Sequence, residues 1–283
     1  MLAPCATSCG GDEPPSGRRP DAGRVLADAG GVPTDGASAG TDAGGSSDDA
    51  GGVSTDAGSS GTDAGTTLGP CDPIPGASYR TLTISGAPTD RPPPVHGDLN
   101  LELRGWEPTG GVLALVDLTG PTDLLAPKLN HLFTDNREPA FVQNYRAHDW
   151  DWGCNCRGAV ITDWDVTVSG MRTSPDEVLE VPTSGYDIGE GLRALVLFVD
   201  DDSLTLKFTR EDNVVSGYTV HVQGVCVEPS LRALYDARRA AGSSELPALA
   251  GDQPFGRART SEILVAIRDT GAFMDPRSRK DWW

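Results

Sequence analysis

The sequence predicts a mainly β protein, a sandwich or rolled antiparallel sheet with one peripheral helix, preceded by a disordered linker. Three observations predict this class. Short stretches of alternating apolar and polar residues recur from about residue 79 onward, which is typical of half-buried strands. Clusters of Gly, Pro and Asp separate these stretches, as turns require. Only one segment has both the apolar spacing and the end signals of a substantial helix.

The expected elements follow along the chain. Strands are predicted over residues 79–84, 99–103, 112–118, 141–145, 159–168, 178–181, 194–199, 204–208, 218–222 and 263–267. The helix is predicted over 229–241, because Pro229 suits a first helical position and Gly242 ends the segment. A second, short helix is expected near 124–133. A boundary near Gly158 would divide the β region into subdomains 70–158 and 159–283.

Residues 10–69 are expected to form the disordered linker. Aspartate recurs there every seven residues, mostly in Asp-Ala-Gly, although no apolar stripe of a coiled coil accompanies the repeat. A segment made mainly of Gly, Ala, Ser, Thr and Asp buries too little apolar surface to offset its loss of conformational entropy. The repeated residues are Asp21, Asp28, Asp35, Asp42, Asp49, Asp56 and Asp63.

Residues 1–9 resemble a truncated bacterial lipoprotein signal. Ala6-Thr7-Ser8-Cys9-Gly10 is similar to the small-residue motif whose cysteine becomes acylated. The resemblance implies a lipid anchor at Cys9 and a place in the cell envelope, at the outer membrane or cell surface. Only Met1 to Pro4 stand where the apolar core of such a signal is expected. Either translation starts further upstream, or Cys5 and Cys9 are ordinary residues at the start of a cytoplasmic protein.

The composition limits the partners. A formal net charge of −18 argues against nucleic acid as a partner, because a nucleic-acid-binding domain needs a basic surface. No stretch of about 18 continuous apolar residues predicts a transmembrane helix.

Four cysteines of the β region, Cys71, Cys154, Cys156 and Cys226, are expected to form two disulfides in an exported chain. A Cys154–Cys156 bond is the least expected pairing, because alternate residues of a strand lie near the upper Cα distance for a disulfide. Each of them is expected to bond to Cys71 or Cys226. A four-cysteine zinc site is the alternative, but the chain lacks the usual paired C-x-x-C.

Tryptophan alternates with aspartate in two neighbouring segments, residues 148–157 and 162–165. An indole face stacks on the apolar face of a sugar while carboxylates accept its hydroxyl hydrogen bonds, so a glycan- or peptide-binding site is one interpretation. A calcium site is the second, and tryptophans packed against the disulfides are the third. The ligand-binding candidates are Trp150, Trp152, Asp163, Trp164 and Asp165.

Paired carboxylates would also suit a glycosidase, which needs two of them about 5 to 9 Å apart. The sequence does not give that distance. The candidates are Asp149, Asp151, Asp163, Asp165 and Glu190.

The carboxyl-terminal half, from about residue 160, carries the motifs Gly217-Tyr-Thr-Val-His221-Val and Arg268-Asp-Thr-Gly271-Ala-Phe-Met-Asp275-Pro276. This succession of turns and strands resembles the lysostaphin-like zinc endopeptidases that cut peptidoglycan cross-bridges. The resemblance implies a metal aspartate at Asp165 and a further active-site histidine at His221.

The metal site departs from that family. Ile161 and Leu264 stand where the family has histidines, and Glu262 is at best a substitute ligand, whereas a zinc hydrolase needs three protein ligands. We therefore assign no catalytic residues, and expect at most zinc or calcium as a cofactor. The segment from Cys71 onward also resembles a domain of uncharacterised exported bacterial proteins.

These observations predict a cell-envelope lipoprotein whose non-catalytic β-domain binds envelope polymer, either peptidoglycan or glycan, or a protein partner. The alternative is a metal-dependent or carboxylate hydrolase that acts on cell wall or glycan.

Overall fold

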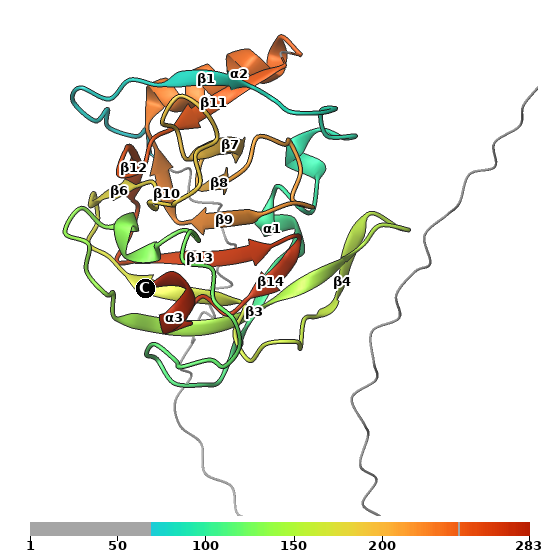
Figure 1. Cartoon of the computed structure of the whole chain (residues 1–283), viewed down its shortest axis with the longest axis vertical. Helices are drawn as coiled ribbons and strands as arrows, with labels where there is room; N and C mark the ends of the chain where they lie inside the picture. The colour runs from blue at the N-terminus through green and yellow to red at the C-terminus, as the bar shows by residue number, and fades with distance from the viewer. Residues whose placement is uncertain (1–68, 243) are drawn as a thin grey trace, which may run out of the picture. The chain divides into compact units, whose positions relative to one another are not determined.

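The computed structural model describes residues 69–242 and 244–283 (Figure 1). The predictions for the lipoprotein signal, Cys9 and almost all of the linker lie outside these residues. The described part is mainly β, as predicted, with a large antiparallel sheet and one main helix.

Eleven strands form the large sheet, in the order β1-β11-β7-β8-β9-β13-β5-β3-β2, with β14 paired to β13 and β4 paired to β3. A second sheet has the order β10-β12-β6. The strands are β1 (Arg80–Thr83), β2 (Trp106–Thr109), β3 (Phe141–Asp151), β4 (Cys156–Val160), β5 (Val168–Arg172), β6 (Val178–Glu180), β7 (Ala194–Val199), β8 (Ser203–Lys207), β9 (Tyr218–Gln223), β10 (Val225–Val227), β11 (Glu245–Leu249), β12 (Pro254–Ala258), β13 (Glu262–Asp269) and β14 (Ala272–Met274).

The helical elements are short apart from one. They are η1 (Pro93–Val95), α1 (Leu101–Arg104), η2 (Leu129–Leu132), α2 (Pro229–Ala240) and α3 (Arg279–Trp282). Helix α2 confirms the prediction for 229–241. The Glu228 side chain caps it by accepting hydrogen bonds from the backbone N–H groups of Ser230 and Leu231. The helix packs beside β11 and β7 (Figure 1), and its buried Leu231 and Tyr235 belong to the main core.

Three strand predictions are wrong. Residues 99–103 lead into α1, because the Asn100 side chain accepts a hydrogen bond from the Glu102 N–H and so caps a helical turn. Residues 112–118 make only an isolated bridge between Val116 and Ser278. The single strand predicted over 159–168 is instead the end of β4, a loop and the start of β5.

The expected boundary near Gly158 does not separate two sheets. Strand β3 lies before Gly158 and pairs with β5, which lies after it. Strand β1 in the first predicted subdomain likewise pairs with β11 in the second. One sheet therefore runs through both predicted subdomains.

The central strands β8, β9 and β13 have two different faces, because successive side chains of a strand point to opposite sides. The apolar face belongs to the main core and consists of Leu204, Leu206, Val220, Val222, Ile263, Val265 and Ile267. The polar face is formed by the alternate residues, and its polar members are Ser203, Thr205, Lys207, Thr219, His221, Gln223, Glu262 and Arg268.

The disulfides join Cys71 to Cys226 and Cys154 to Cys156. All four predicted cysteines are bonded, but the pairing we expected is wrong. Cys154 lies in the turn between β3 and β4 rather than in a strand, and Asn155 turns the chain with φ 54°. This bend brings the two Cα atoms to 5.3 Å, within the usual range for a disulfide.

Candidate functional site

A groove of about 660 Å³ opens over the end of the polar face where β13 begins. Its floor comes from β2, β3, β9 and β13. Its rim comes from β12, from the loop before β8 and from the first described residues of the chain. The lining residues are Gly69, Pro70, Asp72, Glu102, Trp106, Tyr145, Asp176, Asp202, Gln223, Gly224, Cys226, Arg257, Arg259, Thr260, Glu262 and Leu264.

Two aromatic side chains form one side of the floor. Trp106 on β2 pairs with Ala147 on β3, and Tyr145 lies two residues before Ala147, on the same face of the sheet. Diagonal neighbours of this kind lie about 7–8 Å apart, so the two side chains line the same part of the floor. Neither ring is fully buried, and together with Leu264 they give the groove an apolar surface.

Glu262 at the start of β13 is the chemically most distinctive group of the floor. A Cβ atom on Gly170 of the neighbouring β5 would overlap its Oε1, so the glycine makes room for the carboxylate. That oxygen is buried and accepts no hydrogen bond from residues 69–242 or 244–283. Burial raises the pKa of Glu262, with the charge of Arg172 opposing the shift. The pKa of Tyr145 is also raised, by burial and by the charge of Glu262.

The rim carries charges of both signs. Arg259 pairs with Asp202 at 3.1 Å and donates to the Gly69 carbonyl oxygen at 3.3 Å. Burial raises the pKa of Asp202, against the opposing charge of Arg259. Arg257 donates from Nη1 to the Asp176 carbonyl oxygen at 3.0 Å, while its buried Nε has no hydrogen-bond partner in the described part of the chain. Glu262 and Arg257 thus both line the groove, and each has one buried polar atom without a hydrogen-bond partner in the described part of the chain.

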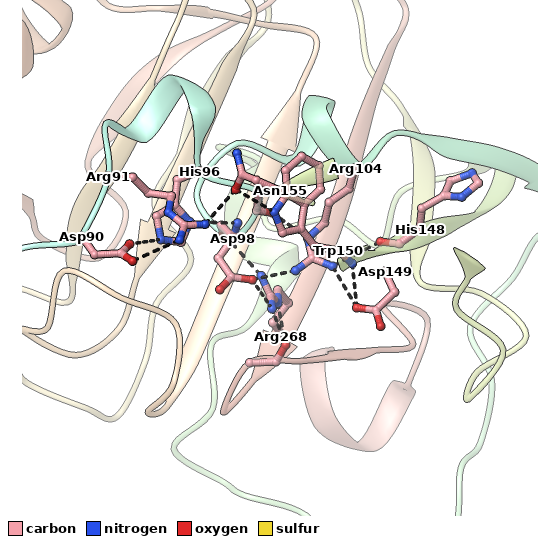
Figure 2. Close-up of polar contacts among 12 residues, drawn as sticks. Asp90, Arg91, His96, Asp98, Arg104, His148, Asp149, Trp150, Asn155 and Arg268 are labelled. Carbon is pink, nitrogen blue, oxygen red and sulfur yellow. Dashed lines mark hydrogen bonds and ion pairs between the residues drawn. The ribbon is translucent and has the colours of Figure 1, made fainter. Parts of the chain in front are cut away.

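The predicted Trp and Asp segments lie elsewhere, and the structure divides them. Trp150 is buried, and its Nε1 donates to Asn155 Oδ1 at 3.3 Å (Figure 2). Trp152 is 44% exposed, lies edge-on to His96 with ring centroids 5.2 Å apart, and has the Arg91 guanidinium 4.8 Å from its ring. These two tryptophans therefore pack together around the β3–β4 turn, with ring centroids 6.3 Å apart.

The second segment does not join them. Trp164 lines a separate hollow of about 430 Å³ with Tyr218 and Trp282. Asp163 is exposed, and Asp165 is exposed and paired with Arg146 at 3.2 Å. The five ligand-binding candidates of the sequence therefore do not form one site.

The carboxylates considered for a glycosidase are also dispersed. Asp149 pairs with Arg104 at 3.5 Å, Asp151 accepts the Gly153 N–H at 2.8 Å, and Glu190 pairs with Arg80 at 3.2 Å. None of these three lines the groove.

The three residues considered as metal ligands, Asp165, His221 and Glu262, are likewise apart. No group of three or more His, Cys, Asp or Glu side chains suited to a metal ion occurs within 69–242 and 244–283. Asp165 is on the surface, Glu262 is in the groove, and His221 is 1% exposed inside the polar face.

His221 is held as a neutral ring. Thr205 Oγ1 donates to the Leu99 carbonyl oxygen at 2.7 Å, so it accepts from His221 Nδ1 at 3.0 Å and places the ring proton there. Burial lowers the pKa of His221 well below its usual value, and the neighbouring Arg268 and Arg104 act in the same direction. A histidine beside two arginines is a poor place for a cation.

Those two arginines share one carboxylate (Figure 2). Asp98 Oδ1 accepts from Arg104 at 2.7 Å and from Arg268 at 2.8 Å, and both guanidinium groups are almost fully buried. Burial alone would raise the pKa of Asp98, but the two cations hold it below its ordinary range. The cluster fixes the 96–104 segment on the polar face next to the groove.

Sequence reasoning missed Trp106, Tyr145, Arg257 and Arg259, and named Glu262 only as a substitute ligand. No local motif in the sequence marks these four residues. Trp106 has no other tryptophan near it in the sequence, whereas tryptophan and aspartate alternate in residues 148–157 and 162–165. The pairing of β2, β3, β5 and β13 brings the groove residues together, and it cannot be read from local patterns.

No protein-family model matches the chain, and no curated protein or solved structure does either. None of the described helices is long and apolar enough to span a membrane.

Proposed function

We propose that the β-domain is an exported, non-catalytic binding domain that holds a segment of envelope polymer, a glycan or peptidoglycan strand, in the groove. One observation carries the proposal. Trp106 and Tyr145 line the same groove as Glu262, whose buried Oε1 has no hydrogen-bond partner among the described residues. A polymer of acetylated sugars presents apolar ring faces, hydroxyl and amide donors, and carbonyl acceptors. The aromatic floor suits the ring faces, the Glu262 carboxylate suits the hydroxyl and amide donors, and the Arg257 guanidinium suits the carbonyl acceptors.

The location is part of the proposal. Disulfides persist in oxidising compartments, and the domain has two of them, which supports export. A lipid anchor at Cys9 would attach the chain to the envelope, next to the polymer. Gly69 and Pro70 enter the domain at the rim of the groove.

The test is binding of the full-length protein to isolated sacculi and to soluble peptidoglycan fragments, measured by co-sedimentation and calorimetry. Trp106→Ala and Glu262→Gln are expected to weaken binding about tenfold, which corresponds to about 1.4 kcal/mol. Trp152→Ala, which removes an exposed aromatic ring outside the groove, is the matched control and should leave the affinity unchanged. Absence of retention, or equal effects of Trp106→Ala and Trp152→Ala, would contradict the proposal.

A carboxylate hydrolase is the second candidate, because two groove carboxyls, Glu262 and Asp202, both have raised pKa values. A general acid needs such a shift at neutral pH. Release of new reducing ends from the same sacculi, lost in Glu262→Gln and in Asp202→Asn, would favour hydrolysis over binding alone.

A further inference from the structure

The Cys154–Cys156 disulfide lies at the tip of the β3–β4 hairpin, which extends away from the body of the sheet (Figure 1). Both cysteines are exposed, and so are their neighbours from Asp151 to Arg157. The other disulfide differs, because Cys71 and Cys226 are partly buried and join residues 155 positions apart.

A bond between residues two positions apart constrains little of the unfolded chain, whereas one that closes a long loop constrains much of it. The hairpin is already fixed without the bond. Asn155 Oδ1 accepts from Arg91 Nη1 at 2.7 Å and from Trp150 Nε1 at 3.3 Å (Figure 2). Stability therefore does not account for this disulfide.

The exposed position of the Cys154–Cys156 disulfide instead suits thiol–disulfide exchange. Exposed disulfides are accessible to an attacking thiolate, and they are the labile members of a set. Trp152 stands two residues before Cys154 and is 44% exposed, which provides an apolar contact surface beside the bond. A polypeptide has side chains to use that surface, and a small hydrophilic thiol does not.

We propose that the Cys154–Cys156 disulfide is a thiol–disulfide exchange site for a cysteine-bearing polypeptide. A cysteine thiolate of the polypeptide attacks one sulfur, forms a mixed disulfide with it, and displaces the other cysteine as a thiolate. A second thiolate of the polypeptide then attacks its own sulfur in the mixed disulfide. The polypeptide gains a disulfide, and Cys154 and Cys156 are left as two thiols, so that the domain is reduced by two electrons as the polypeptide is oxidised.

The test uses the full-length protein and a reduced peptide with two cysteines and flanking apolar residues, followed by acid quenching, alkylation and peptide mapping. Cys154 and Cys156 should become alkylated as one peptide is oxidised per protein, while Cys71 and Cys226 stay protected. Mapping separates these positions from Cys5 and Cys9. A peptide that stays reduced, or equally fast loss of both disulfides, would overturn the proposal.

Two variants make the test specific. The double variant Cys154→Ser, Cys156→Ser should keep the wild-type melting temperature within about 2 °C and lose peptide oxidation. Unchanged oxidation in this variant would refute the site. Trp152→Ala should slow exchange with the peptide about fivefold and leave the rate with reduced glutathione unchanged. An equal effect on both thiols, or on neither, would refute the polypeptide as the partner.

Discussion

The two faces of strands β8, β9 and β13 show how one set of strands serves two purposes. The apolar face is almost completely buried in the main core, where each large side chain stabilises the fold by about 1.5–3 kcal/mol. The polar face is just as closely covered over His221 and Lys207, but its groups need partners to compensate for lost hydration. Stability therefore comes mainly from the first face, and chemical specificity from the second.

The polar face itself divides into paired and unpaired groups. Arg268 and Arg104 are paired through Asp98, and His221 is paired at one nitrogen. Glu262 Oε1 and Lys207 Nζ have no hydrogen-bond partner among the residues that the structure describes. Glu262 lines the groove although its Oε1 is buried, whereas Lys207 is fully buried and does not line the groove. The two unpaired groups therefore differ in their distance from the surface.

Removal of the Asp98 carboxylate, which both arginines share, is expected to have the largest effect on stability. Asp98→Ala leaves the buried Arg268 without a counter-ion and Arg104 with only the exposed Asp149 at 3.5 Å, and is expected to destabilise the fold by about 3–5 kcal/mol in chemical denaturation at pH 7. Asp117→Ala is the control, since Asp117 is 88% exposed in its pair with Arg279, and should cost less than about 1 kcal/mol. Similar values for the two variants would show that the Asp98 cluster does not hold the polar face.

The buried Lys207, whose Nζ has no hydrogen-bond partner among the described residues, should lower the stability of the fold at neutral pH. Burial lowers the pKa of Lys207 to about 8, so its charge opposes folding at neutral pH. Lys207→Met should therefore stabilise the protein at pH 7, by about 3 kcal/mol if packing is kept. The wild type gains stability as pH rises from about 8 to 10.5, because the unfolded chain then binds more protons, so the advantage of the variant should shrink over that range. A variant that is less stable than the wild type at pH 7 would contradict the account.

The buried His221 should make the stability of the protein depend on pH. Its pKa is depressed in the folded state, so its contribution to stability is complete above pH 6.5 and falls as pH drops below that value. The slope is about 1.4 kcal/mol per pH unit for one proton. The His221→Gln variant should lack this dependence, so the free energy of unfolding of the wild type should fall relative to that of the variant when both are measured from pH 7 to pH 5. Parallel curves would mean that His221 titrates normally.

Local pattern was enough for much of the fold. The apolar run at Ala194–Val199 is strand β7, and the Pro229 start and Leu231/Tyr235 face define α2. Pattern failed where a single side chain decided the backbone, as Asn100 does by capping α1 and Asn155 does by turning the β3–β4 hairpin. It failed at the groove for a different reason. Trp106 and Glu262 come to line one groove only through the order of β2, β3, β5 and β13, which depends on long-range pairing.

The most direct test of the proposed groove is an NMR titration of the full-length protein, labelled at the indole nitrogens of its six tryptophans. Soluble peptidoglycan fragments are added, and the signals are assigned by Trp→Phe variants. If the groove binds these fragments, the Trp106 signal shifts with saturation while those of Trp150 and Trp152 stay in place. Saturating shifts at Trp152 with none at Trp106, or no shift at any tryptophan, would contradict the proposed function.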